Sequence, residues 1–261
     1  MNREDYKKII LEGRSILTFF SKFSNRPSGY ISDQEAGADM PPRTKERMTD
    51  DVIDLPAVSS DVIVDNDFFS VLSSRRTQRK YSGKDITPEQ LAYLLWCAQG
   101  IRRIPARSSM SFRTVASGGG KHPFEMYMVI RHVEGMDPGL YHYLPLTDQV
   151  EYLGSGDNLE EFAVKACAGQ TWAAKASVIF FLCADPRRTE WRYGVYAHPL
   201  ILMDAGHVSE NMYLAAASLK LGCCAVAKID PEIISTGFGL DPDEEFPVLG
   251  MTIGVEFLSN S

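Results

Sequence analysis

The fold is decided by the stretch DAGHVSENMYLAAASLKLG, which spans residues 204–222. With the residues before it, this stretch predicts one long helix from Pro199 to Lys220, and Gly222 is a natural stop. The small, apolar run of residues 214–217 predicts that this helix packs closely against another element. A long helix that lies between strand-like segments indicates a fold built from both kinds of element.

Strands and shorter helices are predicted on the N-terminal and C-terminal sides of this helix. The run TPEQ at residues 87–90 combines an N-cap, a proline at the first helical position and a glutamine three residues after the cap. It opens a helix from Leu91 to about Gln99. A short helix is expected around residues 68–72, and strands are expected at 124–131, 178–183 and 248–257. Helices that alternate with strands predict an α+β domain.

The first 65 residues differ in character from the rest of the chain. Apolar side chains recur at helical spacing over residues 3–20, so this segment is expected to be an amphipathic helix. Residues 21–65 are polar and punctuated by proline and glycine, without a sustained period. Because so long a loop is unusual inside a compact domain, it is either mobile or an arm laid over another surface, such as a partner subunit. We therefore divide the chain into an N-terminal helix and arm at 1–65 and a domain at 66–261.

Composition excludes several classes of protein. Of the 261 residues, 44% are hydrophobic and 23% are charged, which excludes a mainly disordered chain, and the net charge of −7 argues against nucleic-acid binding. No apolar run approaches the roughly 18 residues needed to cross a bilayer. The N-terminus has no signal-peptide core, so a cytoplasmic location is expected. The five cysteines form no CxxC motif and are expected to be reduced core thiols, and no spacing typical of a metal site occurs.

The first candidate for chemistry is a run of cations that follows the short helix. Arg75, Arg76, Arg79 and Lys80 lie within six residues, with Thr77 among them. Arginine matches phosphate oxygens with two parallel N–H groups, and a threonine hydroxyl adds a donor. A phosphate monoester would fit here, whereas the alternative is a solvated basic face.

Two further segments contain glycines close to a predicted element. Residues 113–123, RTVASGGGKHP, precede a strand, and their three glycines let the backbone approach a ligand. Their spacing matches neither GxGxxG before a helix nor a Walker A loop, and the alternative is a flexible connection. Residues 219–226, LKLGCCAV, place small residues just past a helix end, which leaves room for a flat ring. The alternative there is an ordinary turn with two buried thiols.

Taken together and in this order, these motifs resemble the FMN-dependent nitroreductase family. The likeness runs from about Val52 to the C-terminus and is closest to the SagB-type branch, which is related to the azoline dehydrogenases of peptide-natural-product maturation. The motifs that carry it are SRRTQRKY at 74–81, LLWCAQGI at 94–101, RTVASGG at 113–119, VEGMDPGLYHY at 133–143, WRYG at 191–194 and the stretch 204–222.

The resemblance implies a fold and a cofactor. The implied fold is a mixed β-sheet flanked by helices, assembled as an intertwined homodimer with FMN at the interface. Arg75 and Arg76 would bind the FMN phosphate with Thr77 close by, and Arg79 would lie toward the ribityl chain and the pyrimidine edge. A cation there suits the negative charge of reduced flavin. The remaining residues implied to contact the ring are Ser117, Gly118 and Gly119, whose loop would bring a backbone N–H to N5, and Gly222, Cys223 and Cys224 on the other side.

Two departures from the family pattern concern charge. Many members have a basic residue near the C-terminus that reaches the phosphate, whereas residues 250–256 of this chain, GMTIGVE, contain no cation. Azoline dehydrogenases carry a Lys-Tyr pair as base and acid, whereas here Arg192 precedes Tyr193. Because arginine stays protonated, it cannot be a general base. Tyr193 is either a proton donor or a packing residue.

Three functional hypotheses follow. The first is an FMN-dependent oxidoreductase in which NADH or NADPH passes a hydride to flavin N5, and a nitroaromatic, a quinone or a similar small electron acceptor then binds at the same face. The second is a SagB-type dehydrogenase that oxidises azolines in a modified peptide, with a peptide-processing partner and a base other than Arg192. The third is a non-catalytic flavin-binding protein, motivated by the missing C-terminal cation and by the unusual run Gly120-Lys121-His122.

Overall fold

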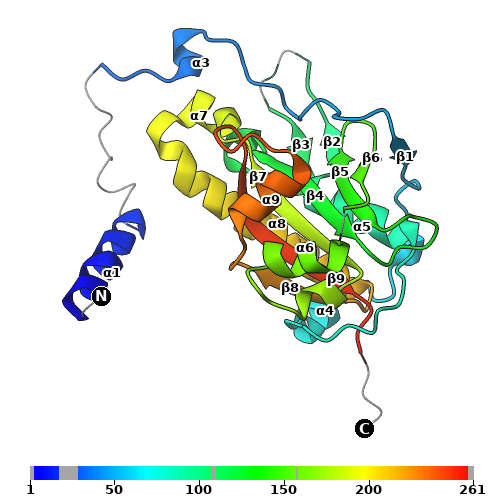
Figure 1. Ribbon diagram of the computed structural model, residues 1–261. Helices are drawn as coiled ribbons and strands as arrows, with labels where there is room; N and C mark the ends of the chain where they lie inside the picture. Colours follow the sequence, from blue (N-terminus) through cyan, green and yellow to red (C-terminus); the bar gives the residue numbers. More distant parts are fainter. Residues whose placement is uncertain (1–2, 18–28, 107, 109, 157, 258–261) are drawn as a thin grey trace.

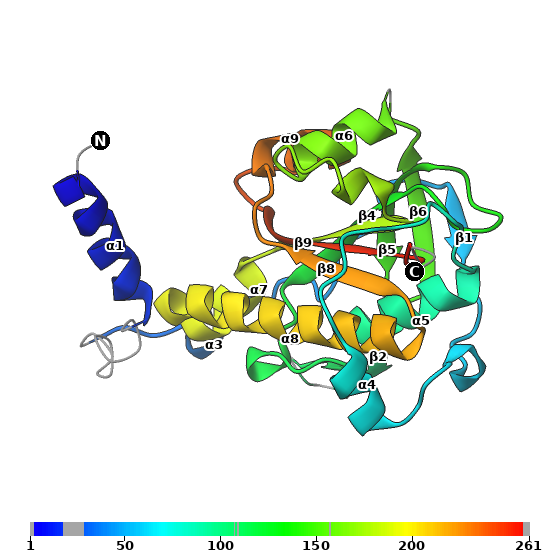
Figure 2. The same ribbon diagram turned by 90° about the horizontal axis from the view of Figure 1, so that it is seen from below.

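The computed structural model describes residues 3–17, 29–106, 108, 110–156 and 158–257 (Figure 1). A seven-stranded sheet forms the middle layer of the domain. Helices α5 (Pro88–Gln99) and α8 (Ala197–Ser218) cover one face of this sheet, and α6 (Leu159–Ala166) and α9 (Pro231–Phe238) cover the other (Figure 2). One hydrophobic cluster therefore lies on each side of the sheet.

Neighbouring strands of the sheet pair in antiparallel fashion, and one parallel bridge lies at its edge. Its strands, in spatial order, are β1 (Val52–Asp54), β6 (Gln149–Gly154), β5 (Gly139–Leu144), β4 (Phe124–Ile130), β7 (Val178–Ala184), β9 (Phe246–Gly254) and β8 (Gly222–Val226). A parallel bridge joins Thr77 to Cys223 beside β8. The predicted mixed sheet flanked by helices is confirmed. A separate two-stranded sheet consists of β2 (Ile101–Arg103) and β3 (Phe112–Arg113).

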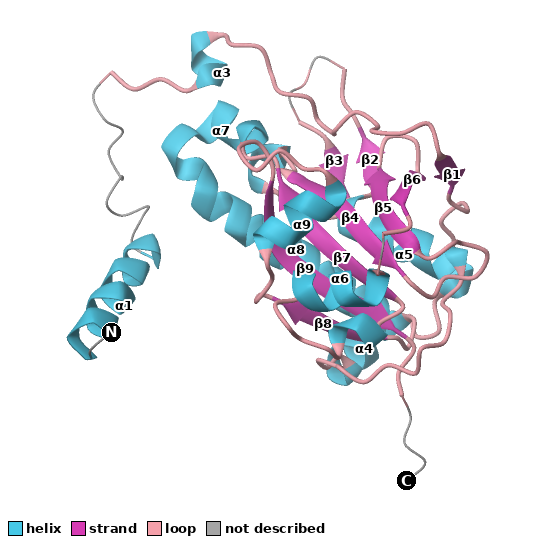
Figure 3. Ribbon diagram, viewed as in Figure 1, coloured by secondary structure: helices cyan, strands magenta, loops and turns pink. Residues whose placement is uncertain are grey.

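Figure 3 shows the helices of the domain, and the start of α5 follows from a local signal in the sequence. Thr87 caps α5 through the amide of Gln90, whose own side chain accepts from the Thr87 amide, so the predicted capping motif is confirmed. The apolar face of α5 is completely buried against the sheet and consists of Leu91, Leu94, Leu95 and Ala98. Two shorter helices are α4 (Phe68–Ser74), where a short helix was expected, and α7 (Arg187–Tyr193).

Several predicted boundaries were wrong by two or three residues, and the ends of α8 and β9 show the cause. Helix α8 ends at Ser218 rather than at residue 220, because the chain turns at Lys220 into the left-handed region with φ 57°. Strand β9 ends at Gly254 rather than at residue 257. Beyond it, Glu256 forms a bridge with Tyr81, so the chain leaves the ladder with β7 and β8.

The arm lies over the surface of its own chain. Helix α1 (Arg3–Leu17) forms where a helix was predicted over 3–20, and residues 18–20 fall outside the described part. Among its described side chains, Ile9, Ile10 and Leu11 are more than half exposed. Farther along, α3 (Asp33–Ala36) contacts α7, and β1 pairs with β6. Residues 29–65 therefore pack on the domain, and β1 alone extends its sheet.

Candidate functional site

A pocket rich in cations lies at the C-terminal end of α8. Its volume is about 120 Å³. The lining residues are Ser74, Arg75, Arg76, Tyr213, Ala217, Lys220, Leu221, Cys223 and Glu256. The guanidinium carbon of Arg75 lies 5.3 Å from the centre of the Tyr213 ring. Among the lining side chains, three cations and one carboxylate leave an excess of two positive charges, which suits an anion, and one of the cations, Lys220, is also paired with Asp65.

The C-terminal segment contributes a carboxylate to this pocket. Glu256 stands in the region where a cation was found to be missing, and its carboxylate lies 3.7 Å from a guanidinium nitrogen of Arg76. Lys220 supplies a third cation from the turn after α8. Sequence analysis missed Lys220 because it lies outside the local run of cations.

Thr77, Arg79 and the segment 222–224 lie side by side at the edge of the sheet. The Gln78 amide donates to the Cys223 carbonyl at 2.8 Å, and the Thr77 and Tyr213 hydroxyls are 3.3 Å apart. A Cβ added to Gly222 would lie 2.8 Å from Cγ of Gln78, so this close approach requires glycine. The predicted residues of the first and third candidate segments are thus neighbours.

Arg79 points away from the cation pocket. Its guanidinium carbon lies 5.6 Å from the centre of the Trp172 ring, and it also interacts with the thiol of Cys224. Burial raises the pKa of Cys224, although Arg79 opposes that effect. The five cysteines are free thiols, and four of them are buried, in agreement with the expected core thiols.

The glycine turn, residues 117–121, lies beside the N-terminal half of α8 and is held by one carboxylate. Gly119 and Gly120 have φ of 60° and 63°, conformations that favour glycine. Asp204 of α8 accepts from the Ser117 hydroxyl at 2.6 Å and from the Gly118 amide at 3.0 Å. The Gly118 N–H is therefore already engaged. Burial raises the pKa of Asp204, while these two donors oppose the shift.

Sequence analysis did not identify Asp204 as a site residue. The signal was present in the stretch 204–222, where this aspartate lies on the buried side of a mostly apolar helix and is only 3% exposed. A buried carboxylate needs hydrogen-bond donors, but its donors come from a loop 86 residues away in sequence.

Tyr193 of α7 lies against the same turn. A Cβ added to Gly119 would lie 2.6 Å from the Tyr193 hydroxyl oxygen and 3.0 Å from Cδ of Arg192. Lys121, at the end of the turn, has its ammonium nitrogen 4.3 Å from the centre of the Trp191 ring. Burial, together with the charges of Arg192 and Arg43, lowers the pKa of Lys121 to about 8. The turn thus brings a phenol and a lysine of lowered pKa into one region.

The cation pocket and the glycine turn are two separate groups along α8. Asp204, which holds the turn, and Tyr213, which lines the pocket, are nine residues apart in one helix. That spacing corresponds to about 14 Å at roughly 1.5 Å per residue. The two groups therefore suit the two ends of an elongated ligand.

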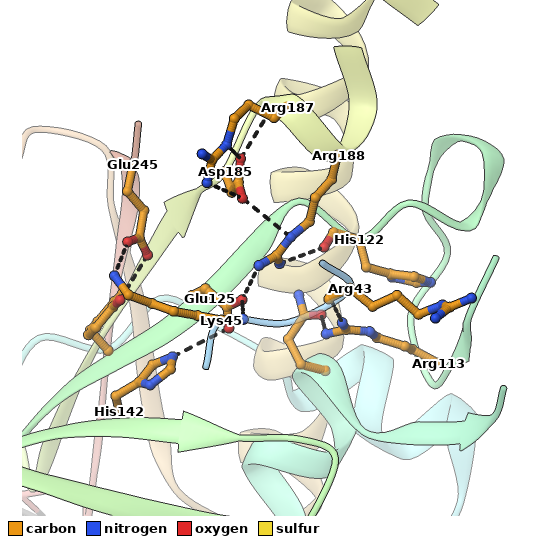
Figure 4. Close-up of polar contacts among 12 residues, drawn as sticks. Arg43, Lys45, Arg113, His122, Glu125, His142, Asp185, Arg187, Arg188 and Glu245 are labelled. Atoms are coloured by element: carbon orange, nitrogen blue, oxygen red, sulfur yellow. Dashed lines mark hydrogen bonds and ion pairs between the residues drawn. The ribbon is translucent and has the colours of Figure 1, made fainter. Parts of the chain in front are cut away.

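A buried network of charges lies on the other side of the glycine turn. Figure 4 shows Glu125 between Arg188 and His142. The second ring nitrogen of His142 lies 2.7 Å from Glu151. Burial alone would lower the pKa of His142, but the hydrogen bonds to Glu125 and Glu151 raise it. Burial likewise opposes ionisation of Glu125, yet Arg188 and His142 hold its pKa far below the ordinary value.

The same carboxylates hold the arm. Glu125 accepts the amide of Lys45 at 2.6 Å, and Glu151 accepts the amides of Met48 and Thr49 at 2.6 and 2.8 Å. These backbone N–H groups have no partner within a sheet ladder or helix, so the carboxylates satisfy them. The arm is therefore bound by carboxylates of β4 and β6.

Two negative findings apply to the described residues alone. In that part of the chain, no three metal-ligating side chains come together in a way that could hold a metal ion. No helix there is long and apolar enough to cross a membrane.

These features agree with what is known of one class of protein. The sequence model of the nitroreductase family matches residues 72–255, well over half of the chain. This chain belongs to the nitroreductase family, whose members are oxidoreductases that generally use a flavin.

Several relatives make the relationship more specific. The nitroreductase-type protein MJ1384 of Methanocaldococcus jannaschii is 32% identical over 185 residues, which cover 70% of this chain and 88% of that protein. The trifolitoxin-processing protein TfxB of Rhizobium leguminosarum is 24% identical over half of this chain, and the match covers 36% of TfxB. The likeness to TfxB supports the link to the SagB-type branch.

Solved structures share the fold. A nitroreductase-type protein from Ralstonia eutropha superposes with a TM-score of 0.66 at 24% identity, over 85% of this chain and 97% of that one. A chain of the Escherichia coli microcin synthetase McbBCD complex, with truncated pro-MccB17 bound, superposes with a TM-score of 0.61 at 15% identity, over 100% of this chain and 95% of that one.

Proposed function

We propose that this protein is an FMN-dependent oxidoreductase that uses NADH or NADPH to reduce nitroaromatics, quinones or similar electron-poor acceptors. The observation that carries the proposal is the pair of groups along α8, a cation pocket at one end and a glycine turn at the other. Membership of the nitroreductase family supports a flavin. The proposed electron acceptor is a small molecule, and no nucleic acid or membrane partner is proposed.

The residues fit the shape and charge of FMN. Arg75, Arg76 and Thr77 would hold the phosphate in the cation pocket, where two positive charges are in excess. Gly222 allows residues 77–79 to lie against β8, so Cys223, Cys224 and Arg79 would flank the ring. Ser117, Gly118 and Gly119 would lie against the other side of the ring. When bound, FMN would supply the chemistry of hydride acceptance and donation.

The residues of the chain itself would position the flavin and polarise the electron acceptor. Asp204 would keep the glycine turn in place through Ser117 and Gly118. Because the Gly118 N–H is engaged by Asp204, a different backbone N–H of the turn would serve flavin N5. The Tyr193 hydroxyl, in contact distance of Gly119, would donate a proton to the acceptor.

We also propose that the protein is a homodimer in the cytoplasm. Helix α4 presents Phe68, Phe69 and Leu72 with exposed fractions of 66%, 79% and 45%. An apolar patch of this kind is typical of an association surface. The division of the chain at residue 65 stays a prediction.

The test of the proposed function is an absorption spectrum of the purified protein, recorded without oxygen before and after addition of NADH or NADPH. We expect visible flavin bands that bleach with one or both nucleotides. Bands that persist with both would exclude a nicotinamide-oxidising enzyme. A protein that neither carries flavin nor takes up added FMN would refute the proposed cofactor.

Replacement of Arg75 or Arg79 by alanine is expected to weaken FMN binding at least tenfold without loss of the fold. A charge-assisted contact contributes on the order of 1.5–3 kcal/mol, which Arg75 would make to the phosphate and Arg79 to the ring, and neither arginine is buried. Fluorescence titration of the flavin-free protein measures the affinity.

Arg75→Ala should weaken the binding of FMN and spare that of riboflavin, which has no phosphate, whereas Arg79→Ala should weaken the binding of both. The matched control is Arg47→Ala, since Arg47 pairs with Asp50 outside the pocket. Wild-type affinity in both variants would contradict the assignment.

A second candidate function is oxidation of azolines in a modified peptide. The sequence likeness to TfxB favours it. It requires a base other than Arg192, and Lys121 would serve, because it ends the turn that Tyr193 contacts and its pKa is lowered. In this case the flavin bands would persist with both nicotinamides and bleach with an azoline-containing peptide. Bands that respond to neither would indicate the non-catalytic flavin-binding protein.

A further inference from the structure

The turn that ends α8 contains a lysine where glycine is usual. The Leu221 amide donates to the Ala216 carbonyl at 2.8 Å, and the Lys220 amide donates to the Ala217 carbonyl at 3.1 Å. These two bonds define a Schellman motif, in which the residue in the left-handed conformation is most often glycine. Lys220 holds that position with φ 57°. A residue with a Cβ is strained there, so the backbone gives no reason for lysine.

The side chain of Lys220 faces two features at once. It lines the cation pocket with Arg75 and Arg76. Its ammonium nitrogen also lies 2.6 Å from a carboxylate oxygen of Asp65, which is largely buried. Because an ammonium group has three N–H donors, the bond to Asp65 leaves others for a second anion. Asp65 thus holds the amine at the wall of the pocket.

The other cations of the pocket are partly compensated. Glu256 lies 3.7 Å from Arg76 and is itself mostly buried, so its charge opposes an incoming anion. Residues 250–256 offer no cation. Lys220 is paired with Asp65, yet its remaining N–H groups make it a third cationic donor at the pocket wall, whereas without it two arginines and one carboxylate would face the anion. A phosphate monoester carries nearly two negative charges near neutral pH.

We propose that Lys220 is a phosphate-binding residue that replaces the missing C-terminal cation of this family. The inference rests on the proposed function, since the phosphate is that of FMN. Lysine is retained at a position that favours glycine because its ammonium group completes the charge of the pocket. Strain at a non-glycine residue is thus linked to binding.

The test is Lys220→Gly, in which charge and strain have opposite consequences. We expect the affinity of the flavin-free full-length chain for FMN to fall about tenfold, as for loss of one charge-assisted contact. The affinity for riboflavin should stay unchanged, because riboflavin lacks the phosphate. The flavin-free Lys220→Gly variant should melt at a higher temperature than Lys220→Gln, because both lose the ion pair with Asp65 and only glycine relieves the left-handed conformation.

Three further variants separate charge from backbone. Lys220→Arg keeps the charge and should retain FMN affinity. Lys220→Gln keeps the strained backbone without the charge and should lose FMN affinity. Ala168→Gly is the matched backbone control, since Ala168 has φ 49°, and it should leave FMN affinity unchanged. Unchanged FMN affinity in Lys220→Gly, or equal losses for FMN and riboflavin, would overturn the inference. Wild-type protein that binds neither flavin would instead refute the proposed function.

Discussion

Replacement of Glu125 by glutamine is expected to lower the free energy of unfolding by about 3–5 kcal/mol. Glu125 is 2% exposed. It forms ion pairs with Arg188 and His142 and accepts a hydrogen bond from the backbone amide of Lys45. The amide of glutamine has nearly the same shape but no charge, so Arg188, which is 4% exposed, would lose its main counter-charge. Only the more distant Asp185, at 3.7 Å, would remain near it. Urea denaturation followed by circular dichroism measures the change.

Two comparisons make this result specific to the buried network. Glu160→Gln is the matched control, because Glu160 also pairs with two cations but is half exposed, and it should change stability little. The double variant Glu125→Gln/Arg188→Met should be less destabilised than the sum of its single variants, since it removes both buried charges. Additive losses, or a small effect of Glu125→Gln alone, would show that the network does not stabilise the fold.

Replacement of His142 by glutamine is expected to lower stability by about 3 kcal/mol near pH 6 and by less once the pH has passed the folded pKa of His142. The pKa of His142 is raised by two carboxylates. Its contribution is therefore complete below the unfolded pKa of about 6.5 and is lost as the pH rises through the folded value. Wild-type stability should decrease over that range by up to about 1.4 kcal/mol per pH unit.

The carboxylates of the same network act in the opposite direction. The pKa values of Glu125 and Glu151 are lowered, so their contribution is present above about pH 4.3 and is lost as the pH falls through the folded values. The variant lacking His142 should therefore still lose stability as the pH falls into the acid range. It should no longer lose stability as the pH rises above 6. Urea denaturation across the pH range measures both. His198→Gln, at an exposed histidine that pairs with Glu190, serves as the control. A variant with the wild-type dependence above pH 6 would contradict the role of His142.

Local signals in the sequence predicted the main helices and the central strands. The capping motif at Thr87 defined the start of α5, and the apolar run of β7 and the nearly apolar run of β4 defined these two strands. The predicted boundaries were wrong where long-range contacts determine the end of an element. At the end of β9, for example, Glu256 pairs with Tyr81 instead of continuing the strand.

The parts of the site that escaped prediction depend on residues far apart in sequence. Asp204 holds a turn centred on Gly118, and Lys220 joins Arg75 across the end of a helix. Glu125 lies in an apolar strand, and a lone acid there is a signal of a buried partner. The identity of that partner depends on the packing of α7 against the sheet, which no local pattern reports.

The pairing of the arm with β6 also determines how two copies of this chain can meet. One edge of the main sheet ends in the three-residue strand β1, and at the other edge the segment around Thr77 lies along β8. Short or covered edges cannot serve as templates for strands of another molecule. A continuous sheet across two subunits is therefore disfavoured. Association through helical faces is favoured instead, and the aromatic side chains of α4 are already exposed for such a contact.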